Sequence, residues 1–107
     1  MANTFKNAGV AIGTSNTTLY TCPAATTTVV HAVYISNVDG TNDATVDLLV
    51  TDNSLGSDLY IMKTVDVPAD SSLVIEKPIN LEAQDILKVK ASAAGDLQAF
   101  ASVLEMT

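Results

Sequence analysis

Apolar and polar residues alternate with a period of two along most of this chain. In the segment "DATVDLLVT" every second residue is apolar, and the series is Ala44, Val46, Leu48 and Val50. The residues between them are Asp, Thr and one Leu. Because successive side chains of a strand point to opposite faces, this pattern predicts a β-strand at 43–51 with one face in a core.

The same period predicts further strands, separated by turns rich in Gly, Pro, Asn and Asp, at 17–22, 28–38, 59–67, 73–76, 85–91 and 97–106. A helix has little support, since even "NLEAQDILKVKASAA" repeats its apolar residues at two rather than at 3.6. About seven to eight short strands without helices predict an all-β fold, an antiparallel β-sandwich of immunoglobulin-like or small jelly-roll type. We expect one domain over residues 1–107, in which residues 1–15 are free to form an extended N-terminal arm.

Two of the predicted strands are apolar on both faces. In 28–38 one face carries Val29, His31, Val33 and Ile35, and the other carries Val30, Ala32, Tyr34, Ser36 and Val38. In 97–106 the residues Leu97 and Val103 lie opposite Phe100, Leu104 and Met106. A two-layer sandwich buries only one face of each sheet, so the other face needs a partner. We therefore predict a homo-oligomer and a protein interface that contains Val30, Tyr34, Phe100 and Leu104.

The charge of the chain limits its partners. Twelve acidic residues stand against five lysines and no arginine, which gives a formal net charge of −7. Binding to a phosphate backbone depends on cationic side chains, so we expect no nucleic-acid partner. No apolar run has the length of a membrane span, and the start "MANTFKNAGV" lacks the features of a secretory signal. We expect a soluble protein without a membrane partner, made in a cytoplasm.

The only cysteine and the only histidine, Cys22 and His31, lie in "YTCPAATTTVVHAVYIS". A thiolate nucleophile needs a nearby cation or helix N-terminus and a base, while a structural zinc site takes four ligands dominated by Cys and His. The sequence around Cys22 offers neither the activating groups of a nucleophile nor the four ligands of a zinc site. An internal repeat also aligns "CPAATTTVV" with "VPADSSLVI" and places Cys22 where Val67 stands. We interpret Cys22 as a core residue and predict no catalytic residue, no cofactor and no enzyme activity.

The acidic segment "NVDGTNDATVD" raises the question of a metal site. Asp39 and Asp43 carry hard oxygen ligands of the kind that calcium prefers, but the spacing does not fit an EF-hand loop. Asp-Gly is also a strong hairpin signal. We favour a solvated hairpin tip and predict no metal site, with Asp39 and Asp43 as the candidates if one exists.

The segments "LYTCPAATTTVVHAVYISNVDGTNDATVDLLVTDN" and "TVDVPADSSLVIEKPINLEAQDILKVKASAAGDLQAFASVLEM" resemble small virion structural proteins of tailed bacteriophages, including phages of cyanobacteria and other marine hosts. The resemblance covers residues 17–106 and rests on the two Pro-Ala turns and on "LEAQDILKVKAS". It implies a small β-sandwich and a role as a virion component. It transfers no catalytic residue.

Within that class, the resemblance and the charge favour a capsid decoration (cement) subunit. A chain with a net charge of −7 is repelled by packaged DNA, so we expect it on the exterior of the particle. Its expected partners are the major capsid protein or other virion proteins, and a trimer is the first expectation because decoration proteins often sit at threefold positions. A tail, neck or fibre-attachment protein is the alternative within the class. A host-surface carbohydrate-binding module is the alternative of another class, although Trp is missing and the tyrosines, at positions 20, 34 and 60, are scattered.

Overall fold

The computed structural model of the chain describes residues 2–107, and these form strands joined by short turns. Nine strands occur in the described residues: β1 (Asn3–Ala11), β2 (Thr17–Thr21), β3 (Thr27–Asn37), β4 (Ala44–Asp52), β5 (Ser57–Val67), β6 (Ser72–Ile75), β7 (Ile79–Leu81), β8 (Ile86–Ala91) and β9 (Leu97–Met106). The predicted all-β class is therefore confirmed. Residues 2–107 contain no helix that is long and apolar enough to span a membrane.

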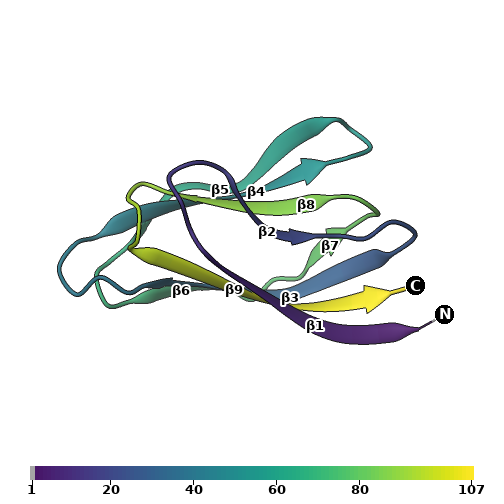
Figure 1. Cartoon of the computed structure of the whole chain (residues 1–107), viewed down its shortest axis with the longest axis horizontal. Coiled ribbons are helices and arrows are strands. Elements are labelled where there is room, and N and C mark those ends of the chain that lie inside the picture. Colours follow the sequence, from purple (N-terminus) through teal and green to yellow (C-terminus); the bar gives the residue numbers. More distant parts are fainter. Residues whose placement is uncertain (1) are drawn as a thin grey trace.

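The strands form two antiparallel sheets that pack face to face, as a β-sandwich (Figure 1). One sheet has the order β1-β9-β3-β6, with β7 pairing the same edge of β3 as β6, and the other has the order β2-β8-β4-β5. The first strand pairs with the last in one sheet, and the second pairs with the last but one in the other. This wrapped order is that of a jelly roll, so the topology selects the jelly roll over the immunoglobulin-like alternative.

Strands β1 and β7 had no counterpart among the strands that the alternation predicted. Residues 3–11, which the sequence left free to form an arm, lie in the sheet as β1 and pair with β9 from Asn3↔Met106 to Ala11↔Gln98. The three-residue β7 forms in a segment that looked like a turn, "EKPIN", and pairs with the first half of β3.

The core lies between the sheets and consists mainly of Val, Leu and Ile. Its largest fully buried side chains are Ile12, Val30, Val33, Ile35, Val46, Leu48, Val67, Leu81, Leu87, Val89 and Leu97. Fully burying one such side chain contributes about 1.5–3 kcal/mol. The fold therefore depends on aliphatic packing.

The internal repeat in the sequence corresponds to two similar turns. Cys22 directly follows β2 and Val67 ends β5, and both side chains are fully buried. Three residues later, Ala25 and Asp70 each have a φ of 56°. The repeat therefore marks two strand-to-strand crossings of the same local shape, and Cys22 is a core residue like Val67.

The connecting loops gather at two ends of an elongated body that measures 47 × 27 × 20 Å. At one end the loops at 38–43, 68–71 and 92–96 are joined by bonds from Asp70 N to Asp39 O (3.1 Å) and from Val38 N to Asp96 O (2.7 Å). The termini lie at the other end (Figure 1), where Thr107 N donates to Ala2 O at 2.9 Å. The outer faces of the two sheets lie between these ends.

Candidate functional site

The outer face of the β1-β9-β3-β6 sheet carries no charged side chain in the described part of the chain. This face, called the neutral face below, is formed by odd-numbered residues 3–11 of β1, even-numbered residues 98–106 of β9, residues 27, 29, 31, 32, 34 and 36 of β3, residues 72 and 74 of β6 and residue 80 of β7. The intervening positions of these strands point to the core. In a chain with 17 charged residues among 107, counted as 12 acidic plus 5 basic, a sheet face of this size without charge is unusual.

Large apolar side chains form rows across the neutral face. Phe5 is 77% exposed, Phe100 45%, Tyr34 41% and Val74 39%. Strand pairing places Gly9 beside Phe100, Phe100 beside Tyr34, and Tyr34 beside Val74. The rings of Tyr34 and Phe100 lie 6.3 Å apart in a tilted arrangement, and those of Phe5 and His31 stack at 6.1 Å. Exposed aromatic side chains in such rows are typical of protein-interface cores.

The neutral face is not smooth. A shallow hollow of about 260 Å³ lies between Phe5 and Phe100, and a second of about 430 Å³ lies on the other side of Phe100, beside Gly9 and Tyr34. The ring of Phe100 therefore stands between two depressions. The face therefore has a protruding aromatic ring and, on either side of it, shallow hollows.

Three of the predicted interface residues lie on the neutral face, and one does not. Tyr34 and Phe100 are exposed, and Leu104 is half-buried between Phe5 and Val29. Val30 is fully buried in the core, so the expectation that it faces outward is wrong. The pairing of β3 with β9 shifts by one residue between Val30 and Ala32, and this bulge reverses the alternation. Val30 therefore points inward together with Val33 and Ile35.

Cys22 and His31 do not lie together in the fold. Cys22 is fully buried, and its Sγ lies 3.2 Å from Thr28 Oγ1 and 3.3 Å from Thr26 O. His31 is exposed on the neutral face, against Phe5. The thiol and the imidazole thus lie on opposite sides of the sheet and do not form a pair.

The outer face of the β2-β8-β4-β5 sheet differs from the neutral face because it carries both signs of charge. This surface, called the charged face below, includes Asp47, Lys63, Asp66, Lys88 and Lys90. Asp47 is paired with Lys90 across the strands, and Lys63 Nζ lies 4.6 Å from the centre of the Tyr60 ring. These charges are suited to contact with water, although β5 of the same sheet also exposes Leu59 (50%), Tyr60 (48%) and Ile61 (42%).

The carboxylates of Asp39 and Asp43 stabilise loops. Asp39 accepts hydrogen bonds from Thr41 N (2.8 Å), Asn42 N (3.1 Å) and Asn42 Nδ2 (3.2 Å), and these bonds lower its pKa. Asp43 accepts a bond from Ala69 N at 2.9 Å. In residues 2–107 neither belongs to a group of three potential metal ligands. The expectation of a solvated hairpin tip is wrong, because this segment joins β3 of one sheet to β4 of the other and the two strands do not pair.

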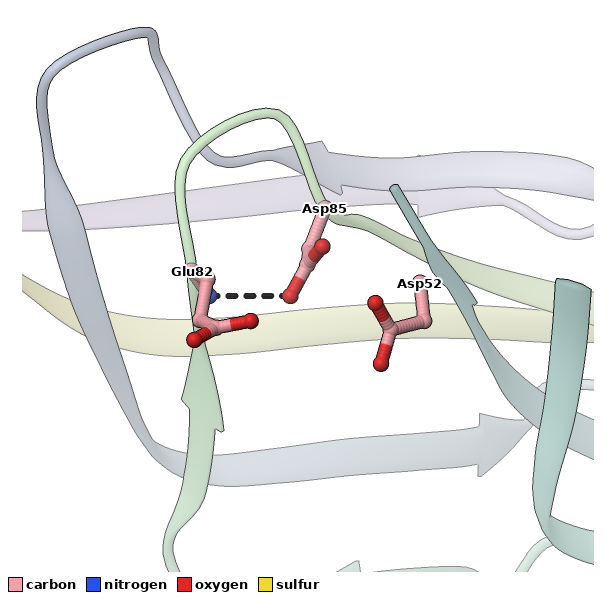
Figure 2. Close-up of side chains that lie close together, drawn as sticks. All are labelled: Asp52, Glu82 and Asp85. Carbon is pink, nitrogen blue, oxygen red and sulfur yellow. Dashed lines mark hydrogen bonds between the residues drawn. The ribbon is translucent and has the colours of Figure 1, made fainter. Parts of the chain in front are cut away.

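Three other acidic side chains do come together at the opposite end of the sandwich. Figure 2 shows Asp52, Glu82 and Asp85, whose nearest carboxylate oxygens all lie within 4.8 Å of one another. The buried Asp85 accepts bonds from Asn53 N and Glu82 N, each at 2.9 Å, so both of its oxygens already have partners. Asp52 accepts bonds from Ser54 and Leu55, which lower its pKa. These carboxylates hold the 53–56 and 82–85 turns together.

No known protein-family model matches the chain, and the comparison with curated proteins finds no match. Solved structures do match. A chain of the acidic stable capsid of Helicobacter pylori bacteriophage KHP30 aligns with a TM-score of 0.60 at 11% identity, over 100% of this chain and 89% of that one. The chain shares its whole fold with a phage capsid component.

Two further structures share the fold. A subunit of the disulfide-linked pili of Bacillus endospore appendages aligns with a TM-score of 0.60 at 13% identity, over 99% of this chain and 87% of that one. The Eiger TNF of S. frugiperda aligns with a TM-score of 0.52 at 16% identity, over 84% of this chain and 64% of that one. At these identities the likeness establishes the fold, and the surface of this chain must indicate its function.

Among the exposed apolar residues of the neutral face, Phe5 and Val74 were not predicted from the sequence. Phe5 stands in a segment left free to form an arm, so its position on a sheet face could not be inferred. Val74 does alternate with Leu73 and Ile75 in a predicted strand. That alternation was the available signal, but it covers four residues only, Ser72–Ile75.

Proposed function

We propose that this chain is a structural subunit of a bacteriophage virion, where it decorates the exterior of the capsid and binds other virion proteins through the neutral face. The neutral face carries this proposal. Protein interfaces are depleted in charge and enriched in aromatic residues at their centres, and the neutral face has both properties. The expected partners are the major capsid protein and other copies of this chain.

The size of the neutral face fits a specific interface. Strands β1, β9 and β3 are each about 30–36 Å long, and β6 and β7 together add about 23 Å; at a spacing of about 4.8 Å they give a footprint of about 600 Å². A standard interface buries about 800 Å² of accessible surface on each partner, and a ridged footprint exposes more accessible area than its projection. One partner of similar dimensions could therefore cover the whole face.

Two further observations support the particular role. The fold of a chain of the KHP30 capsid matches this chain over its whole length, which supports a virion role. The net charge of −7 disfavours a position against packaged DNA. A position in the tail, neck or fibre attachment would use the same neutral face and differs only in its partner.

A carbohydrate-binding role is the second candidate. It is favoured by one observation, the combination of exposed rings with the amide side chains of Asn3, Asn7 and Gln98 on the same face. A role in disulfide-linked fibres, as in the spore pili, lacks support because the single cysteine, Cys22, is fully buried.

The proposal is tested on particles of the phage whose genome encodes the chain. Mass spectrometry of purified particles should detect the chain at a fixed ratio to the major capsid protein. Its lysines should react with an impermeant biotin reagent in intact particles as well as in opened ones. Absence from the particles would refute the virion role, and labelling only after opening would refute the exterior position. If the chain is absent from particles but binds glycans, and a free monosaccharide competes for that binding, the carbohydrate-binding role would be favoured.

A further inference from the structure

The two sheets have four open edges, and three of them are unsuited to pairing with another strand. Edge strand β2 has five residues and a register shift, β5 has two register shifts against β4, and the edge beside β3 is divided between β6 with four residues and β7 with three. Short edge strands and bulges are the devices by which proteins prevent edge-to-edge association.

The fourth edge, β1, has none of these devices. It is nine residues long, contains no proline, and pairs with β9 in an unbroken register. In residues 2–107 no other strand pairs with its outer side, and Figure 1 shows β1 along the border of the sheet. Its one charged side chain, Lys6, turns back to Glu105 of its own chain, with Nζ 2.9 Å from Oε1. The charge of Lys6, whose side chain is 53% exposed, is thus paired within its own chain.

The hydrogen bonds at the two ends of β1 fix which backbone groups are free. Ile12 N donates to Leu97 O, and Thr107 N donates to Ala2 O, each at 2.9 Å. Because hydrogen-bonded pairs alternate along an antiparallel ladder, the even-numbered residues of β1 bond to β9. The N–H and C=O groups of Asn3, Phe5, Asn7, Gly9 and Ala11 therefore point away from the sheet.

We propose that two copies of this chain associate by antiparallel pairing of their β1 strands about a twofold axis at Asn7. Asn7 is the midpoint of β1, so this register uses the whole strand and forms about ten interchain backbone hydrogen bonds. It sets Phe5 of each copy opposite Gly9 of the other. An aromatic ring beside a cross-strand glycine is a stabilising arrangement in sheets, because the ring covers the exposed backbone.

A second copy is the occupant because the arrangement is self-complementary. The Lys6 residues of the two copies become diagonal neighbours in this register, but each is paired with Glu105 of its own chain. With a net charge of −7, two copies repel each other through most of their surfaces, but β1 and the neutral face beside it carry no free charge. Pairing also joins the two neutral faces into one continuous surface. The resulting dimer differs from the trimer expected from the sequence, and it does not depend on the virion role.

The first test is the mass of the purified chain by light scattering over a concentration series. The expected result is twice the 11.1 kDa of one chain. Asn7→Pro should convert the protein to a monomer, because the ring blocks an outward N–H that makes no bond within the chain. Asn7→Ala keeps that N–H and should remain a dimer. A wild-type monomer at about 1 mM, a trimer, or a dimer that tolerates Asn7→Pro would overturn the proposal.

The second test keeps the proposal falsifiable if Asn7→Pro fails to fold. Under mild oxidation Asn7→Cys should form a disulfide-linked dimer, since the Cα atoms of a hydrogen-bonded pair lie about 5.5 Å apart, within disulfide range. Asn3→Cys is the matched control, because the two copies of residue 3 are separated by about 27 Å in this register. Wild type, with Cys22 buried, gives the background. Equal crosslinking of the two variants, or none in either, would overturn the proposal.

Discussion

The two outer faces of this sandwich differ in chemistry although the same fold exposes both. The charged face carries Asp47, Lys63, Asp66, Lys88 and Lys90, whereas the neutral face carries no ionised side chain at the positions defined above and exposes Phe5, Tyr34 and Phe100. Both sheets follow the same alternation, and the inner residues of both are aliphatic. The difference between the faces therefore reflects what each outer surface contacts, rather than what the fold requires.

The distribution of charge explains why this difference matters for assembly. A chain with a net charge of −7 resists close approach to copies of itself and to other acidic proteins. Association is least costly where no charge has to be desolvated. The neutral face meets that condition, and the charged face does not.

The largest effect on stability is expected from a pair of substitutions that compares the inner side of the β1-β9-β3-β6 sheet with its outer side, the neutral face. Val30→Asp places an unpaired charge in the core and should cost more than about 4 kcal/mol, which prevents stable folding. Val74→Asp, on the outer side of the same sheet, should cost less than about 0.5 kcal/mol. Urea unfolding followed by circular dichroism measures both. Similar losses in the two variants would mean that the assigned sides are wrong.

The next effect separates the two outer faces directly. Tyr34 on the neutral face and Tyr60 on the opposite sheet are 41% and 48% exposed, so they form a matched pair. Tyr34→Asp should weaken binding to particles that lack the chain by about 30-fold, as for an interface hot spot. Tyr60→Asp should leave binding nearly unchanged. A reversed order would assign the contact to the other sheet.

A smaller effect is expected from Glu105, which links the sheets at the β1 edge. Its carboxylate accepts bonds from Tyr20 of β2 and from Lys6 of β1, and these bonds hold the pKa of Glu105 below its ordinary value of 4.5. A lowered carboxyl pKa stabilises the fold above the unfolded-state pKa, and this stability is lost as the pH falls through the folded-state value. Glu105→Gln should cost about 1–2 kcal/mol at pH 7 and flatten the acid limb of the stability curve.

The control for Glu105 is Glu76→Gln, because Glu76 is exposed. Thermal unfolding at several pH values between neutral and strongly acidic measures both variants. If the stability of Glu105→Gln depends on pH as steeply as that of the wild type, the link between the sheets is not the source of the acid sensitivity.

The smallest effect concerns Asp39 and Asp96, which lie in the loops at 38–43 and 92–96, at the end of the sandwich opposite the termini. Burial and, after it, the charge of Asp39 raise the pKa of Asp96, so folding makes the loss of the Asp96 proton less favourable. Asp96→Asn should therefore raise Tm at pH 7 by about 1–2 °C, and the gain should disappear as the pH falls below the ordinary carboxyl range. Asp39→Asn should lower Tm instead, because the Asp39 carboxylate accepts two backbone bonds. Calorimetry in which both variants shift Tm in the same direction would contradict this account.

Periodicity predicted most strands because apolar alternation is strong in the middle of the chain, as in residues 43–51 and 28–38. It failed for β1, whose sequence NTFKNAGVA has few large apolar residues and whose partner, β9, is distant in the sequence. It also gave Val30 the wrong side, because a single bulge residue at the centre of β3 reverses the alternation without leaving a signature in the sequence. Tyr34 and Phe100 were found because their strands are apolar on both faces.

The absence of charge from the neutral face could not be read from one strand at a time. It emerges only when β1, β3, β6 and β9, which are far apart in the sequence, are placed side by side. The acidic group of Asp52, Glu82 and Asp85 was missed for the same reason, since its members come from two separate turns.

A cryo-EM map of intact particles is the most direct test of the central claim that the neutral face is the assembly surface of a virion protein. The account predicts that Phe5, Tyr34 and Phe100 lie within contact distance of a neighbouring subunit, while Asp47, Lys88 and Lys90 of the charged face remain in solvent. A map in which the charged face makes the contacts and the neutral face is exposed to water would contradict it, as would particles without density for the chain.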